Sequence, residues 1–119
     1  MRKLVLIVED EEDLATIFSR VMKMAGFEVA VAQDGHAALN HLARWTPDLV
    51  ILDLHLPGVS GEDILREIRR SERLAATQVM LVTADLLKAE ALSDQAEATL
   101  IKPIRIHQLL EVARTLCPS

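Results

Sequence analysis

The sequence contains little of what several large classes of protein depend on. Its 119 residues include one cysteine, no tyrosine, two phenylalanines and one tryptophan. The single cysteine, Cys117, cannot form an internal disulfide, and this favours a reducing compartment. With so few aromatic residues, the core must be built from Leu, Val, Ile, Ala and Met. Half of the residues are hydrophobic, which is enough to fill one core.

Long apolar runs and an excess of positive charge are also missing. The apolar run at residues 4–8 is too short for a signal-peptide core or a membrane span. We therefore expect a soluble, cytoplasmic protein that does not insert into a membrane. The net charge of −5 argues against direct binding of nucleic acid. The four histidines are scattered, which argues against a zinc site.

The sequence does contain a series of short apolar runs that are typical of buried strands. We predict strands at residues 4–8, 29–32, 49–53, 79–82 and around 100–101. Helical spacing predicts helices at about 14–25, 36–45, from a cap at Ser60 through Ile68, within 86–92, and at 105–116. In the first helix Ile17 is expected on the buried face, as is Ile106 in the last helix. In the third helix Arg69 is expected to face water with Arg66, Glu67 and Arg70.

Five strands that alternate with five helices predict one α/β domain over residues 1–119, a doubly wound (βα)5 fold. A parallel sheet of five strands with helices on both faces follows, because parallel strands need crossover connections. The strand order itself does not follow from periodicity. Ligands of such sheets bind beyond the carboxyl ends of the strands.

Polar side chains gather at those strand ends. Glu9 and Asp10 follow the first strand, Asp53 ends the third, Thr83 follows the fourth and Lys102 follows the fifth. Asp53 alone could be a loop cap or a reactive group. Thr83 could begin the fourth helix as its N-cap, in addition to any role at the site.

This set of side chains predicts chemistry on a phosphoryl group. Several carboxylates close together repel one another, and a divalent cation relieves the repulsion. Hard oxygen ligands favour Mg²⁺ over zinc. A metal, a lysine and a hydroxyl group around one aspartate would stabilise the charge of a phosphoryl group in transfer, and aspartate can accept such a group covalently.

Four short motifs carry a resemblance to a known family. They are Val8-Glu9-Asp10, Leu52-Asp53-Leu54-His55-Leu56-Pro57-Gly58 with Gly61, Thr83-Ala84, and Lys102-Pro103. Together, and in these positions, they resemble the receiver domain of response regulators in two-component signalling, in particular the chemotaxis receivers. The resemblance covers essentially the whole chain. It implies a flavodoxin-like strand order of 2-1-3-4-5.

The resemblance also implies the role of each site residue. Asp53 would accept the phosphoryl group. Asp10 would bind Mg²⁺ directly, Glu9 would bind it directly or through water, and the backbone carbonyl of His55 would add a ligand. Thr83 would be the switch hydroxyl group, and Lys102 would pair with a phosphoryl oxygen. A cis peptide bond is expected between Lys102 and Pro103.

The function implied is a phosphorylation-dependent switch rather than an enzyme acting on foreign substrates. A histidine kinase or phosphotransfer protein would donate the phosphoryl group, and a downstream protein would bind at the face of the fourth helix, fifth strand and fifth helix. The resemblance allows a weak or phosphorylation-dependent dimer, and no output domain is expected within this chain. The alternative is a receiver-like interaction module that works without phosphorylation. A flavodoxin-type cofactor site is disfavoured, because no glycine-rich loop follows the first strand.

Two departures from the family pattern affect the output face. Thr99 stands where the family usually has an aromatic residue that turns inward on activation. The stretch from Thr83 to Lys102 is also a few residues shorter than usual, and we expect the loss to fall on the fourth helix or its flanking loops.

Overall fold

The computed structural model describes residues 2–118, and within them five strands alternate with five α-helices as predicted. The elements are β1 (Leu4–Val8), α1 (Glu12–Met24), β2 (Glu28–Ala32), α2 (Gly35–Arg44), β3 (Leu49–Asp53), α3 (Gly61–Arg70), β4 (Gln78–Thr83), α4 (Leu86–Leu92), β5 (Ala98–Ile101) and α5 (Ile106–Leu116). Two short 3₁₀ helices, Glu72–Leu74 and Ser93–Gln95, follow α3 and α4 and were not predicted.

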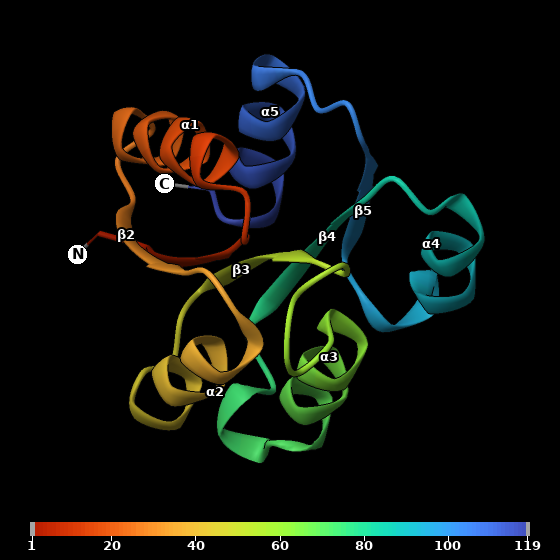
Figure 1. Cartoon of the computed structure of the whole chain (residues 1–119). Coiled ribbons are helices and arrows are strands. Elements are labelled where there is room, and N and C mark those ends of the chain that lie inside the picture. The colour runs from red at the N-terminus through yellow and green to blue at the C-terminus, as the bar shows by residue number, and fades with distance from the viewer. Residues whose placement is uncertain (1, 119) are drawn as a thin grey trace.

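The strands form one parallel sheet in the order β2-β1-β3-β4-β5. This is the order that the family resemblance implied. Helices α1 and α5 cover one face of the sheet, α2 and α3 cover the other, and α4 lies beside β5 (Figure 1). No helix within residues 2–118 is both long enough and apolar enough to cross a membrane.

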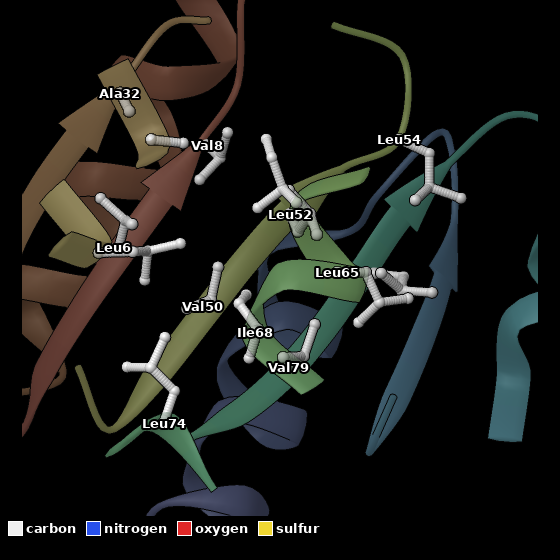
Figure 2. Close-up of a cluster of buried hydrophobic side chains, with 14 of the residues drawn as sticks. Leu6, Val8, Ala32, Val50, Leu52, Leu54, Leu65, Ile68, Leu74 and Val79 are labelled. Atoms are coloured by element: carbon white, nitrogen blue, oxygen red, sulfur yellow. The ribbon is translucent and has the colours of Figure 1, made fainter. Parts of the chain in front are cut away.

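The core is divided by the sheet into two clusters of buried side chains. On the α2 and α3 side, Leu65 and Ile68 pack towards side chains of β1, β3 and β4 such as Leu6, Val50 and Val79 (Figure 2). On the other side, Phe18 and Met22 of α1 and Leu109 of α5 form the second cluster. Each fully buried side chain of this size contributes about 1.5–3 kcal/mol to folding. Because β1, β3 and β4 are buried on both faces, their sequences read as continuous apolar runs.

The buried stripes of α1 and α5 are narrower than their apolar patterns. Ile17 is 42% exposed and Ile106 is 53% exposed, so the prediction that they face the core was wrong. Both helices lie in an outer layer on one face of the sheet (Figure 1), where packing covers only one stripe of each helix. Apolar spacing alone cannot show how wide the covered stripe is.

Arg69 also departs from prediction, because its side chain is half-buried instead of facing water. Its guanidinium group donates to both carboxylate oxygens of Glu97, at 2.8 and 3.0 Å, and to the backbone carbonyls of Gln95 and Thr77. Glu97 also accepts the backbone N–H of Val79. Arg69 therefore ties the end of α3 to the segment that leads into β5.

The loop between β3 and α3 is held close to the end of β3. A Cβ atom at Gly61 would lie 2.4 Å from the carbonyl oxygen of Asp53 and 2.5 Å from the Cα atom of Leu54, so only glycine fits there. Gly58 has a φ of 75°, which favours glycine in the turn. Ser60 caps α3 by accepting the N–H of Asp63, as predicted. The loop that follows Asp53 is thus fixed by tight packing and a helix cap.

Candidate functional site

The strand register brings the predicted polar residues to one edge of the sheet. Val8 of β1 lies opposite Leu52 of β3, and Asp53 lies opposite Val82 of β4. At the same edge of the sheet, Thr83 of β4 lies opposite Ile101 of β5. The carboxyl ends of four adjacent strands therefore carry the predicted residues. Asp53 and Thr83 belong to these pairs, and Glu9 and Lys102 directly follow Val8 and Ile101.

Asp53 is only 3% exposed, and both of its carboxylate oxygens accept hydrogen bonds. Oδ1 accepts a hydrogen bond from the backbone N–H of His55 at 2.9 Å, and Oδ2 accepts one from the ammonium group of Lys102 at 3.1 Å. The first contact is a loop cap and the second belongs to a cluster of charges. The loop-cap interpretation of Asp53 is therefore confirmed, and its role as a reactive group stays a prediction.

Glu9 is a second buried carboxylate in this cluster, with 1% of its surface exposed. Oε2 accepts the backbone N–H of Glu11 at 3.1 Å. Oε1 lies 3.2 Å from Nζ of Lys102 but accepts no hydrogen bond within the described residues. Burial and the neighbouring Asp53 together raise the pKa of Glu9 to about 7.

Lys102 lies between the two buried carboxylates. Burial alone would lower its pKa, but Asp53 and Glu9 outweigh burial and raise the pKa above its ordinary value. Lys102 is therefore positively charged at neutral pH. Its backbone N–H donates to the carbonyl oxygen of Thr83 at 2.9 Å, and the peptide bond to Pro103 is cis, as the resemblance implied.

The site has the oxygen ligands that a hard divalent cation requires. One carboxylate oxygen each from Glu9, Asp10 and Asp53 lie within 4.8 Å of one another, and Asp10 is exposed. Two buried carboxylates, those of Glu9 and Asp53, share a single lysine, and one buried oxygen of Glu9 accepts no hydrogen bond from residues 2–118. A cation with oxygen ligands would satisfy that oxygen and relieve the repulsion, so these residues fit Mg²⁺.

Thr83 is 3% exposed, and its hydroxyl oxygen accepts the backbone N–H of Asp85 at 3.0 Å. Asp85, not Thr83, is the N-cap of α4, because its side chain accepts the N–H of Lys88. The prediction that Thr83 could be the N-cap was wrong. An aspartate directly before an apolar segment was a cap signal in the sequence that the prediction missed.

Five of the six predicted site residues therefore lie at the same edge of the sheet, as judged by side-chain contacts or strand positions. They are Glu9, Asp10, Asp53, Thr83 and Lys102. His55 takes part through its backbone N–H, while its side chain is exposed. Thr99 lies in β5 and is half-buried. Helix α4 has seven residues, and it lies in the segment that the sequence indicated to be short.

A family model and the most similar curated proteins all indicate the same family. The family model of the response regulator receiver domain matches residues 5–114. The chain is 36% identical over 112 residues to sensory transduction protein RegX3 of Mycobacterium tuberculosis, covering 94% of this chain and 49% of RegX3. It is 32% identical over 114 residues to DNA-binding response regulator MtrA of Mycobacterium leprae, covering 96% of this chain and 51% of MtrA. The chain therefore spans about half the length of the curated relatives it matches.

Solved structures are similar along nearly the whole chain. Response regulator TrrA of Thermotoga maritima, in complex with Mg²⁺ and BeF, has a TM-score of 0.86 and 30% identity, covering 96% of this chain and 98% of that one. Chemotaxis response regulator CheY4 of Vibrio cholerae has a TM-score of 0.90 at 24% identity, covering 98% of this chain and 99% of CheY4, and so supports the fold alone.

Proposed function

The chain belongs to the response regulator receiver domain family, and we propose that it is a signalling switch phosphorylated on Asp53. The observation that carries this proposal is the contact of the buried Asp53 carboxylate with Lys102, beside the acidic cluster of Glu9 and Asp10. Receiver domains act in phosphorylation-dependent signalling and are not classical enzymes, and this site has the chemistry for such a role.

We propose that Asp53 is the nucleophile. One of its carboxylate oxygens would form a bond to phosphorus while the bond between phosphorus and the donor's histidine nitrogen breaks. The electron pair of that bond leaves with the imidazole, which takes up a proton. The backbone N–H of His55 holds Oδ1 of Asp53 in place, so the carboxylate is oriented before the donor arrives.

The remaining residues have roles around the transferred group. Asp10, Glu9, Asp53 and the backbone carbonyl of His55 would hold Mg²⁺, which supplies charge stabilisation to the phosphoryl oxygens when bound. Lys102 would move its ion pair from Asp53 to a phosphoryl oxygen. The hydroxyl group of Thr83 would donate a hydrogen bond to another phosphoryl oxygen.

The proposal includes partners and a location. A histidine kinase or phosphotransfer protein would be the donor, and phosphorylation would alter the binding of a downstream protein at the surface of α4, β5 and α5. We place this function in the cytoplasm and expect the domain to assist the slow loss of its own phosphoryl group. A weak or phosphorylation-dependent dimer fits the same surface. We also propose that residues 1–119 act as the receiver unit, with no output domain among them.

The direct test is labelling with a small acyl phosphate in the presence of Mg²⁺, followed by intact mass spectrometry. Wild-type protein should gain one phosphoryl group, and Asp53→Asn should gain none. Asp63→Asn is the matched control, because Asp63 is an exposed carboxylate in the first turn of α3. Absence of labelling in the wild type, or equal labelling of Asp53→Asn, would overturn the proposal.

One observation favours a second function, a binding module that works without phosphorylation. Thr99 occupies β5 at the position where the family usually carries its aromatic switch residue, so that route of signal transmission is missing. If this second function were correct, a partner would bind wild-type protein and Asp53→Asn with the same affinity, with or without acyl phosphate.

A further inference from the structure

The chain between β2 and α2 borders the site, although β2 supplies none of the predicted site residues. We call residues 32–36 the β2–α2 corner. The backbone N–H of Glu9 donates to the carbonyl oxygen of Ala32, the last residue of β2, at 3.0 Å. Two residues later, Asp34 caps α2 by accepting the N–H of Ala37 at 2.8 Å. The corner is therefore bonded to a carboxylate residue of the site at its start, and it is fixed by a helix cap at its end.

The same corner touches the β3–α3 loop, residues 54–60, which carries His55. A Cβ atom at Gly35 would lie 2.1 Å from the carbonyl oxygen of Val59 and 2.6 Å from its Cβ atom, so the backbone of α2 packs directly against the loop. Val59 is half-buried and packs against the core cluster on the α2 and α3 side of the sheet. The first turn of α2 thus holds one residue of the loop by backbone contact.

His36 makes a second contact with this loop through its imidazole ring. Cδ2 and Nε2 of the ring lie 3.2 and 3.5 Å from the position that a Cβ atom of Gly58 would take. The ring therefore occupies the space beside Gly58 that a side chain would otherwise fill. Because the side chain of His36 is exposed, this contact adds little to the core of the domain.

We propose that the β2–α2 corner positions the Mg²⁺ site, and that His36 is a positioning residue for the loop that carries the His55 carbonyl. This inference rests on the proposed function, because it concerns the same site. Glu9 reaches the site from β1 and His55 reaches it from β3. The corner touches both the backbone of Glu9 and the loop of His55.

The affinity of a metal site depends on how firmly the surrounding residues hold its ligands. The β3–α3 loop is held on one side by the close approach of Gly61 to Asp53, and on the other side by Gly35 and His36. Removing one of these contacts lets the His55 carbonyl move without unfolding the domain. Metal binding must then order the loop, so the affinity for Mg²⁺ falls.

Hydrogen exchange and Mg²⁺ binding in His36→Ala, both measured by NMR, test the inference. The backbone N–H of His55 donates to Oδ1 of Asp53, so its exchange rate reports the order of the loop in the absence of metal. In the variant this N–H should exchange about fivefold faster, the factor that corresponds to the loss of about 40 Å² of buried ring surface. The dissociation constant for Mg²⁺ should rise about twofold or more.

Two further variants separate the ring contact from other effects of the substitution. His36→Phe keeps a flat ring that can cover Gly58 but removes both ring nitrogens, so it should retain the wild-type exchange rate at His55 and the wild-type Mg²⁺ affinity. His41→Ala is the matched control, because His41 lies in the same helix and its ring packs against Trp45 with the ring centroids 5.2 Å apart. It should change neither quantity.

A merely structural role of His36 predicts a different result. His36→Ala would then lower the midpoint of urea unfolding but leave the exchange rate at His55 and the Mg²⁺ affinity as in wild type, and the inference would be overturned. Equal values for His36→Phe and His36→Ala would also overturn it, because the ring contact would not be the cause. Failure of the proposed function would appear separately, as absence of acyl phosphate labelling on Asp53 in the wild type, since neither measurement requires phosphorylation.

Discussion

The ammonium group of Lys102 lies 3.1 Å from Oδ2 of Asp53, although the two residues are 49 positions apart in the chain. The same ammonium group lies 3.2 Å from Oε1 of Glu9. One cation therefore stabilises two buried carboxylates, and the site balances charges that would otherwise repel each other.

Replacing Lys102 with methionine should destabilise the domain when no Mg²⁺ is present. The substitution keeps much of the side-chain volume but leaves the carboxylates of Asp53 and Glu9 without their cation. The free energy of unfolding in urea should fall by about 1–3 kcal/mol, and Mg²⁺ should recover part of the loss. Lys23→Met, at an exposed position at the end of α1, should cost less than about 1 kcal/mol. Equal losses in the two variants would contradict this prediction.

The pKa of Glu9 predicts a dependence of stability on pH. In the unfolded chain Glu9 loses its proton near the ordinary pKa of 4.5, and in the folded domain it does so near 7. Between these values the folded state binds more protons, so the free energy of unfolding should fall as the pH rises from about 4.5 to about 7 without Mg²⁺. Glu9→Gln should remove this part of the pH dependence.

Mg²⁺ should reverse the fall in the free energy of unfolding with rising pH, because it binds the ionised carboxylate of Glu9. Thermal unfolding measured across this pH range should show a stabilisation by Mg²⁺ that grows as the pH rises towards and past 7. A stabilisation by Mg²⁺ that is the same at pH 5 and pH 8 would contradict the assignment of Glu9 to the metal site.

Gly61 offers a test of the loop that follows Asp53. Gly61→Ala places a Cβ atom 2.4 Å from the carbonyl oxygen of Asp53, so the loop must shift. The variant should lose about 1–3 kcal/mol of stability in urea and bind Mg²⁺ more weakly than wild type. Gly26→Ala is the control, because Gly26 has a φ of 96° but open space around its Cβ position. It should lose about 1–2 kcal/mol from backbone strain without a change in Mg²⁺ affinity.

The sequence by itself determined the alternation of strands and helices and the residues at the strand ends. These features depend on local patterns: apolar runs for β1, β3 and β4, helical spacing for the helices, and turn residues such as Pro57 and Gly58. The sequence also determined which polar residues follow each strand. Parallel strands share one carboxyl edge, so this was enough to predict that Asp53 and Lys102 would come together.

Only the tertiary structure decided which side chains are covered and which partners they find. The exposure of Ile17 depends on how much of α1 the sheet covers, and Arg69 is half-buried because Glu97, 28 residues away, lies beside it. The Thr83 hydroxyl group accepts the N–H of Asp85, and Asp85 takes the cap position. Such contacts depend on the positions of whole elements in three dimensions, and the local patterns of the sequence do not contain that information.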